Sequence, residues 1–329
     1  MRVTQYLRHP RPGAHSIEAI VDTLSSELSS EMEIVRHVSP FPSRGVVPRL
    51  RSMVSAWRHR SEVNHVTGDE HYLALALPRR SVILTIHDLH HLETLRGLRG
   101  WFARLLWIHL PVRHSAIITA ISEASREQIL RITGCDPAKV VVIPNPLAPG
   151  FGPCPPPNNE TPRILAVGTK RNKNLERLTE SIAGLEVELH VLGPLTNDQR
   201  RRLEDLQVEH VQHTNLSQAE VVELYRSVDL VAFPSLAEGF GMPIIEAQSV
   251  GRPVLTSDRS PMKEVAGDAA WLVDPNSTEN IREGIRSILS DTTLRESLVN
   301  KGFTNASRYT RTAIAFRYAR TFREAIVRV

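Results

Sequence analysis

The apolar residues of this chain fall into short continuous runs, and these runs alternate with segments of helical spacing along the whole sequence. In the first half, the continuous runs predict strands at 3–7, 34–38, 63–67, 82–86, 116–120 and 140–143. The spacing between them predicts helices that include 16–28, 73–77, 101–110 and 123–132. Runs that are apolar without polar alternation are typical of parallel strands that are buried on both faces.

A proline-rich stretch at 144–157 then interrupts the pattern and is the best candidate for a linker. Beyond it the alternation restarts, with strands predicted at 164–167, 188–192, 230–233, 253–256 and 270–273. Helices are predicted at 175–183, 199–206, 219–228, 243–250 and 279–289, and the tail at 291–329 is predicted to be further helix.

Repeated strand–helix units in both halves predict an α/β protein with two doubly wound, Rossmann-like domains. We expect an N-terminal domain at 1–153 and a second domain at 154–310, with a C-terminal helix at 311–329 that packs back on the first. Ligands of such sheets lie at the carboxyl ends of the strands, so two facing domains would hold a donor and an acceptor in the cleft between them.

Composition fits this picture. The 329 residues are enough for about two domains, and 41% hydrophobic with 23% charged residues is ordinary for a folded protein. Cys135 and Cys154 are the only cysteines, which fits a reducing cytoplasm rather than a disulfide framework. No apolar run follows the arginines of the first 13 residues, and no stretch of about 18 apolar residues exists. We therefore expect a cytoplasmic protein without an export signal or a membrane span.

The charge is uneven along the chain. The sequence pI is about 9.3. Residues 1–153 carry roughly 18 Lys and Arg against roughly 13 Asp and Glu, whereas the remainder is close to neutral. A basic first half suggests an anionic partner, such as lipid headgroups or a phosphorylated acceptor, and a merely solvated surface is the alternative. No recognition motif for nucleic acid accompanies the charge, so no such partner is expected.

The stretch 233–247 carries the most informative chemistry. Gly239 and Gly241 form a turn after a predicted strand, and Pro243 suits the first position of a helix, which places Glu246 in the first turn. Glycines let a ligand approach the backbone closely, and the free N–H groups at a helix start can hold phosphate oxygens.

The same stretch contains two carboxylates. Glu238 and Glu246 only accept hydrogen bonds when ionised, so they can bind sugar or ribose hydroxyls. The whole arrangement therefore fits a sugar diphosphate. The alternative is a strand, a turn and a helix whose dipole favours an acid near its start, with no ligand.

The spacing of Glu238 and Glu246 resembles the Glu-x7-Glu signature of glycosyltransferase family 4, the glycosyl transferases group 1. Members of this family retain anomeric configuration and have the two-domain GT-B fold. Further segments resemble the family in its order along the chain, at 85–88, 120–123, 143–146, 167–175, 192–194, 265–270 and 273–275. The resemblance thus covers most of the sequence and implies two Rossmann-like domains that face each other across a cleft.

The resemblance also implies roles on the donor side. Glu238 would contact the hydroxyls of the transferred sugar, and Glu246 would bind the nucleotide ribose. The backbone that would hold the sugar and the diphosphate belongs to Gly239, Phe240, Gly241 and Met242.

Other residues would complete the site. Lys173 would place a positive charge on the departing diphosphate, and Thr169 would lie beside the phosphates, where many relatives carry Arg. In the first half, His87 would lie near the transferred sugar, with Asp88 orienting it or capping the next segment, and the loop at Gly13 would face the phosphates. Plainer alternatives are a solvated loop lysine for Lys173 and a strand-end hydrogen-bond network for His87.

The sequence contains no Asp-x-Asp motif, which some transferases use to hold a metal ion. We therefore expect a metal-independent enzyme without a cofactor, in which Lys173 and the helix N-terminus supply the positive field. The resemblance implies that the sugar is transferred by front-face attack with retention of configuration.

The implied function is that of a retaining hexosyltransferase. It would move a hexose, with mannose expected first, from a GDP- or UDP-sugar onto a glycan or lipid-linked glycan in cell-surface polysaccharide biosynthesis. One alternative is a non-catalytic subunit that binds nucleotide sugars. The other is a different GT-B enzyme, such as a nucleotide-sugar epimerase or an inverting transferase.

Two basic stretches of the first half, 46–60 and 95–107, also contain tryptophans and other large apolar residues. This mixture suits helices that lie in a membrane interface, so we expect peripheral binding to the inner face of the plasma membrane. In the alternative, the apolar faces of these helices pack on the sheet and the arginines are solvated.

Overall fold

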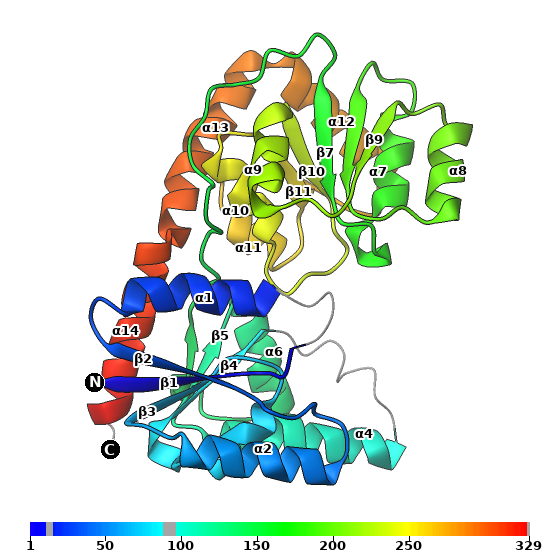
Figure 1. The fold of residues 1–329 in the computed structure, drawn as a ribbon. Coiled ribbons are helices and arrows are strands. Elements are labelled where there is room, and N and C mark those ends of the chain that lie inside the picture. The colour runs from blue at the N-terminus through cyan, green and yellow to red at the C-terminus, as the bar shows by residue number, and fades with distance from the viewer. Residues whose placement is uncertain (11–15, 88–96, 328–329) are drawn as a thin grey trace. The chain divides into compact units, whose positions relative to one another are not determined.

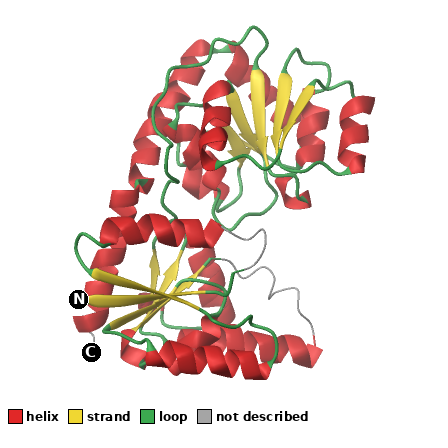
Figure 2. Cartoon of the chain, in the orientation of Figure 1, coloured by secondary structure: helices red, strands yellow, loops and turns green. Residues whose placement is uncertain are grey.

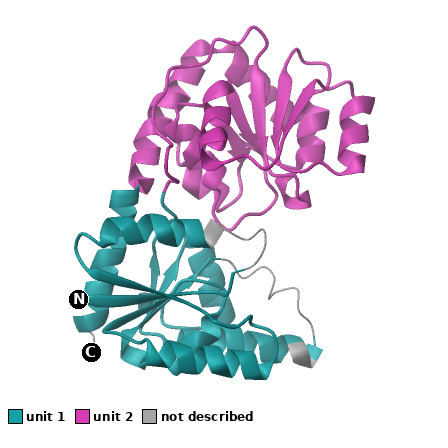
Figure 3. Ribbon diagram, in the orientation of Figure 1, with its two compact units in different colours: residues 1–146, 311–329 teal, residues 147–310 magenta. Residues whose placement is uncertain are grey.

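The computed structural model describes residues 1–10, 16–87 and 97–327. It divides into two compact units, Met1–Pro146 with Arg311–Val329 and Leu147–Thr310 (Figure 3). Both ends of the chain therefore build the first unit, and the second unit is inserted between them.

Residues 147–153 belong to the second unit, whereas the expected boundary assigned them to the first. Hydrogen bonds explain this placement. The Leu147 N–H donates to the carbonyl of Tyr309 at 2.7 Å, and the carbonyl of Gly150 accepts from the Arg226 side chain at 3.3 Å. Most of the proline-rich stretch is thus part of the second unit and is not a free linker.

The first unit is built on a parallel sheet with the strand order β2-β1-β3-β4-β5-β6. The strands are β1 (Arg2–Leu7), β2 (Glu33–Val38), β3 (Val63–Val66), β4 (Val82–Ile86), β5 (Ile117–Ala120) and β6 (Val140–Val142). In the register of this sheet, Tyr6 lies opposite both His37 and Val66.

Helices cover both faces of this sheet (Figures 1 and 2). They are α1 (Ser16–Leu28), α2 (Val46–Arg58), α4 (Gly97–Arg104), α5 (Leu110–His114), α6 (Glu123–Thr133) and α14 (Arg311–Val327), with 3₁₀ turns η1 (His71–Ala76), η2 (Arg79–Ser81) and η4 (Pro137–Lys139) and a π turn η3 (Leu105–His109). Neighbouring residues of one strand lie in different cores, since Ile83 packs with α1 and α14 and Leu84 with α2 and α6. The strands are therefore buried on both faces, as their continuous apolar runs predict.

Helix α14 packs on the sheet of the first unit. Its Tyr318 and Phe322 are buried, and each ring lies 5.3 Å, centroid to centroid, from the ring of His65. His65 forms a hydrogen bond to the Thr85 hydroxyl at 2.7 Å, and complete burial lowers the pKa of His65 to about 3. A neutral, hydrogen-bonded histidine is thus compatible with the apolar helix above it.

The second unit repeats the architecture with the strand order β12-β11-β10-β7-β8-β9. The strands are β7 (Arg163–Val167), β8 (Glu188–Leu192), β9 (His210–His213), β10 (Leu230–Phe233), β11 (Val254–Ser257) and β12 (Trp271–Val273). The helices are α7 (Leu175–Ile182), α8 (Asn197–Asp205), α9 (Gln218–Ser227), α10 (Met242–Ser249), α11 (Met262–Ala266), α12 (Thr278–Ser290) and α13 (Thr292–Ala306), with 3₁₀ turns η5 (Arg171–Lys173) and η6 (Ser307–Tyr309).

Together the two six-stranded parallel sheets confirm the predicted fold class of two doubly wound α/β domains. Strand β9 was not predicted, because Val211 is the only apolar residue of this edge strand. None of the helices in the described part of the chain combines the length and the low charge that crossing a bilayer requires.

Candidate active site

The candidate site lies at the carboxyl edge of the second sheet, where the loops after β7 and β10 meet. The loop after β7 turns at Gly168, whose φ is +86°, and a Cβ there would lie only 3.0 Å from Cε of Lys173. The absence of a side chain at Gly168 therefore lets Lys173 fold across the loop.

Lys173 contacts the loop after β10 directly. Its Nζ lies 2.7 Å from Oε1 of Glu238, and the two side chains are 20% and 13% exposed. The same ammonium lies 4.7 Å from the ring centroid of Phe233, the last residue of β10. The structure thus joins two residues that are far apart in the sequence, and Lys173 is an ion-paired residue rather than a solvated loop lysine.

Asn172 attaches the loop after β7 to the loop after β10. Its side-chain amide donates to the carbonyl of Ala237 at 2.9 Å and to Oε1 of Glu238 at 3.3 Å. Its backbone carbonyl accepts from the Leu236 N–H at 2.8 Å. Sequence reasoning missed this residue. The position beside Lys173 was the available signal, but the partners of Asn172 depend on the tertiary fold.

Asn174 fixes the other end of the same turn. It is buried with φ at +61°, in the left-handed region, and its amide donates to the carbonyls of Pro234 at 3.0 Å and Pro275 at 2.6 Å. Because these carbonyls follow β10 and β12, one side chain connects three strand ends. Asn174 is a second positioning residue that sequence reasoning did not identify.

Helix α10 begins at Met242, so Pro243 is its second residue and Glu246 lies beyond the first turn. The prediction of Pro243 at the first position and Glu246 in the first turn is therefore wrong, because the helix starts one residue earlier, directly after Gly241. The φ of Gly241 is +119°, and a Cβ there would lie 3.1 Å from Cδ1 of Ile244. A glycine is therefore needed where the chain turns into the helix.

The side chain of Phe240 is buried in the second unit. It is 5% exposed, and its ring packs on Tyr309 with a centroid distance of 5.8 Å. Phe240 could therefore contribute only its backbone to the binding of a donor. The first N–H groups of α10 are suited to phosphate oxygens, as is general for helix N-termini.

Glu246 is held by Tyr225, a buried residue of α9. The phenol donates to Oε2 of Glu246 at 2.7 Å, and its ring meets the edge of Phe151 with a centroid distance of 5.2 Å. Burial raises the pKa of Glu246 to about 7, against the opposing effects of the Tyr225 hydrogen bond and the charge of Lys173. The carboxyl group therefore changes its charge near neutral pH.

Thr169 uses its hydroxyl inside the protein. Oγ1 donates to the carbonyl of Pro194 at 2.6 Å, and the Thr169 carbonyl accepts from Gln199 at 2.9 Å. These hydrogen bonds connect the loop after β7 to the loop after β8. The hydroxyl proton of Thr169 is donated to a backbone carbonyl and is therefore not directed to a phosphate. Lys173 is then the cation of this loop that lies beside Glu238.

His87 belongs to the first unit and directly follows β4. Its Nε2 lies 2.9 Å from the carbonyl of Thr67, which follows the neighbouring strand β3. This contact is the strand-end network that was the alternative for His87. The other two residues expected on this side, Gly13 and Asp88, lie outside the described residues.

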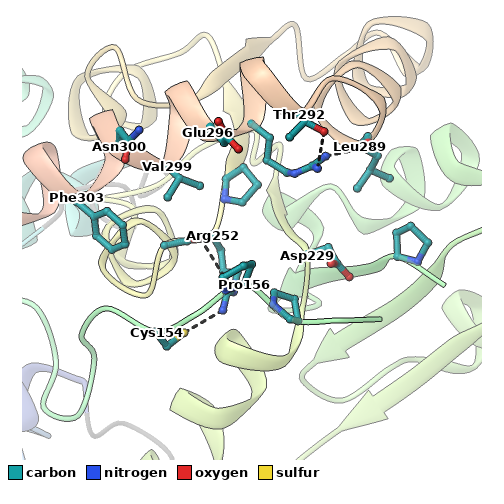
Figure 4. Close-up of a pocket in the computed structure, with 15 residues that line it drawn as sticks. Cys154, Pro156, Asp229, Arg252, Leu289, Thr292, Glu296, Val299, Asn300 and Phe303 are labelled. Atoms are coloured by element: carbon teal, nitrogen blue, oxygen red, sulfur yellow. Dashed lines mark hydrogen bonds between the residues drawn. The ribbon is translucent and has the colours of Figure 1, made fainter. Parts of the chain in front are cut away.

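A cavity of about 680 Å³ opens at the opposite end of the second sheet (Figure 4). Its lining includes Pro162, Asp229 and Pro253, which directly precede β7, β10 and β11. The cavity therefore lies at the amino ends of strands whose carboxyl ends carry Lys173 and Glu238, and it is separate from the candidate site. Among the residues that the structure describes, no cluster of three or more His, Cys, Asp or Glu is arranged to hold a metal ion.

Comparison with known families accounts for both units. Residues 3–146 match the glycosyl transferase 4-like domain, and residues 155–304 match the glycosyl transferases group 1. The chain belongs to the group 1 glycosyltransferases. The resemblance seen in the sequence is thereby confirmed, and the chain is an enzyme of the glycosyltransferase class.

Curated relatives of this glycosyltransferase include two mannosyltransferases. O-antigen chain mannosyltransferase B of Escherichia coli is 25% identical over 285 residues, which are 77% of this chain and 73% of that protein. MMP alpha-(1->4)-mannosyltransferase of Mycolicibacterium hassiacum is 25% identical over 197 residues, and the match spans only 48% of its length.

Solved structures share the fold of this glycosyltransferase. Anabaena Alr3699/HepE, in complex with UDP and glucose, superposes with a TM-score of 0.80 at 17% identity, over 98% of this chain and all of that one. WaaG, a glycosyltransferase involved in lipopolysaccharide biosynthesis, superposes with a TM-score of 0.72 at 14% identity, over 98% and 99% of the two chains. These similarities establish the GT-B fold.

Proposed function

We propose that this glycosyltransferase moves a hexose, with mannose as the first candidate, from a nucleotide-diphosphate sugar to a glycan or lipid-linked glycan acceptor. The observation that carries the proposal is the pairing of Lys173 with Glu238 beside the start of α10. The names of the two mannosyltransferases support mannose, and the UDP and glucose bound to HepE support a nucleotide-sugar donor.

Each group of the site has a task in this reaction. The ionised Glu238 accepts hydrogen bonds from sugar hydroxyls, and Glu246 accepts them from the ribose. Lys173 and the N–H groups at the start of α10 balance the negative charge that grows on the diphosphate as the sugar leaves. Because this positive field is in place before the reaction, it stabilises the transition state more than the ground state. Retention of configuration is the expectation inherited from the family.

The donor base is left between guanine and uracil, because the names of the two mannosyltransferases state no nucleotide and the UDP belongs to a structural neighbour at 17% identity. A thermal-shift screen with GDP, UDP and their sugars separates them. A nucleotide at about 100 times its dissociation constant stabilises the fold by roughly 2.7 kcal/mol. We expect a clear shift with one base and a small shift with the other.

We further propose that the acceptor is presented at the cytoplasmic face of the plasma membrane. The support is the name of a third relative, N,N'-diacetylbacillosaminyl-diphospho-undecaprenol alpha-1,3-N-acetylgalactosaminyltransferase of Campylobacter jejuni, which describes a lipid-linked acceptor. That protein is 29% identical over 34% of this chain.

The deciding experiment measures cleavage of GDP-mannose and of UDP-hexoses with and without polyprenyl-diphosphate glycans. Transfer of labelled sugar to an acceptor supports the proposal. Binding of a nucleotide sugar without any turnover, across the acceptor set, would instead identify a non-catalytic binding subunit. Isomerisation of the donor sugar would identify an epimerase.

A further inference from the structure

The first unit exposes an unusual number of large apolar side chains on two neighbouring segments. On α2, the exposed residues are Val46, Val47, Leu50, Val54 and Trp57, each at least 51% exposed. On α4 and the turns that follow, they are Trp101, Phe102, Leu106 and Leu110, between 37% and 55% exposed. Single exposed apolar residues are ordinary, but a contiguous set marks an interaction surface.

Helix α2 presents its apolar stripe outward. Val46, Leu50, Val54 and Trp57 follow one another at intervals of three or four residues, so they share one face of the helix. The fully buried residues of the helix are the small Ser52 and Ala56. A helix that only covers a sheet would bury its large apolar residues, and therefore folding does not account for this stripe.

The second segment repeats the pattern. Phe102, Leu106 and Leu110 are exposed at intervals of four residues, while Ile108 between them is completely buried. Trp101 lies against Phe102 with a ring-centroid distance of 4.9 Å. The alternative, in which the apolar faces of both stretches pack on the sheet, is therefore wrong for these exposed side chains.

The two segments form one surface. The guanidinium of Arg49 on α2 lies 4.4 Å from the ring centroid of Trp107 in the π turn after α4. Figure 1 shows α2 and α4 side by side on one side of the first unit. We call the nine exposed side chains and the arginines around them the α2–α4 surface.

The charge of this surface is entirely positive in the sequence. No Asp or Glu occurs between Glu33 and Glu62, whereas α2 and its flanks carry Arg44, Arg49, Arg51, Arg58 and Arg60. Arg60 lies over the ring of Trp57, 4.1 Å from its centroid, so cation and apolar residue are presented together. Residues 97–122 likewise contain arginines and no acid.

We propose that the α2–α4 surface docks the enzyme on an anionic lipid bilayer. The apolar side chains would enter the interface between headgroups and acyl chains, and the arginines would contact lipid phosphates. The inference rests on the proposed function, because it gives a lipid-linked acceptor a place where the enzyme meets it. A protein partner would need acidic groups to match the arginines, and those groups are what an anionic membrane supplies over its whole surface.

The test is co-sedimentation of the full chain with vesicles of phosphatidylcholine alone and with up to 40% phosphatidylglycerol, at low and high salt, about 0.05 and 0.5 M. We expect binding to rise steeply with anionic lipid and to fall with salt. The variant Leu50→Ser/Trp57→Ser should bind at least about tenfold more weakly, and Arg51→Ala/Arg58→Ala should lose most of the dependence on anionic lipid. All four residues are exposed, so their replacement should leave folding intact.

The matched control is Phe316→Ser, which removes a 62% exposed side chain from α14. It should bind vesicles like the parent. Equal, negligible binding of the parent to neutral and anionic vesicles at low salt would overturn the proposal. So would dimerisation in sedimentation velocity that the α2 variant abolishes, since a second copy would then cover the surface. Donor cleavage and transfer to a soluble acceptor should be unchanged in these variants, which separates a failure of docking from a failure of the proposed reaction.

Discussion

At the scale of single residues, the ion pair between Lys173 and Glu238 is the feature on which the proposed chemistry depends. The lysine has a carboxylate as its partner before any donor arrives. In the proposed reaction, a diphosphate bound at the start of α10 would compete for the same ammonium group, and Glu238 would then be released to accept hydrogen bonds from the sugar. The pair therefore holds both groups in position without a ligand.

We expect Lys173→Ala to lower kcat about 10²–10³-fold with a smaller change in KM for the donor, because the charge that Lys173 balances grows in the transition state. Steady-state kinetics with saturating acceptor measure both constants. Lys170→Ala is the control, since Lys170 is an exposed cation of the same loop. An unchanged kcat in the Lys173 variant would remove the residue from the mechanism.

The charge of Glu246 gives a second prediction. Its pKa is raised from 4.5 to about 7, so the folded state favours the protonated form. This contribution to stability is complete below pH 4.5 and is lost as the pH rises through 7. At pH 8, the unfolding free energy of Glu246→Gln should therefore exceed that of the parent, by at most about 3 kcal/mol. At pH 5 the two proteins should have nearly the same unfolding free energy, and denaturant titrations at both pH values measure it.

Nucleotide binding should respond in the opposite sense. The ionised carboxylate is the stronger acceptor, so the affinity of the parent for its nucleotide should rise as the pH increases through about 7. Tyr225→Phe removes a hydrogen bond that lowers the pKa of Glu246, and the midpoint of this pH dependence should move upward. Calorimetric titration with the preferred nucleotide between pH 5.5 and 8.5 measures both curves. A flat profile in the parent would contradict the ribose role of Glu246.

At the scale of elements, the turn from Asn172 to Asn174 connects the strand ends that form the site. The amide of Asn174 satisfies two carbonyls that would otherwise be buried without a donor. Its left-handed backbone explains why this position holds Asn, which adopts that conformation more readily than most residues. A buried polar side chain thus stabilises the turn that carries Lys173.

Replacement of Asn174 separates these effects. Asn174→Gly keeps the backbone conformation but loses the side-chain amide, so it should lower the unfolding free energy by about 2 kcal/mol. Asn174→Ala also strains the left-handed backbone, so it should lower the unfolding free energy by about 1 kcal/mol more. Gln207, with φ at +51°, is a second left-handed position, and Gln207→Gly serves as the control without loss of stability. Urea unfolding of the three variants measures the difference, and equal stability of both Asn174 variants with the parent would contradict the positioning role.

The strands show what the sequence can predict. The run Val82–Ile86 is apolar except for Thr85, so the pattern of its residues alone indicates burial on two faces. The edge strand His210–His213 is extended because its backbone pairs with that of β8, and its own residues give little signal of a strand. In the site, the spacing of Glu238 and Glu246 was visible, whereas the partners Asn172, Asn174 and Tyr225 arise only when distant elements pack. Likewise, the outward face of α2 is fixed by which side of the helix meets the sheet.

At the scale of the whole molecule, the proposed reaction draws its positive charge from the chain itself. Lys173 and the start of α10 serve the diphosphate, and the sequence lacks the Asp-x-Asp motif. We therefore expect transfer activity to persist in EDTA at the level of the untreated enzyme. The measurement is the initial rate before and after chelation, with added manganese as a comparison. Complete loss in EDTA that manganese restores would contradict a metal-independent mechanism.

The chain enters the second unit at Leu147 and leaves it after Thr310. The Leu147 N–H donates a hydrogen bond of 2.7 Å to the carbonyl of Tyr309, the residue before Thr310. The whole second unit is therefore an insert with adjacent ends. Such an insert can be exchanged between related genes as one cassette, with both new junctions at a single spot on the folded protein. If the second unit binds the donor and the first unit the acceptor, as proposed, the choice of nucleotide sugar and the choice of acceptor could then be inherited separately.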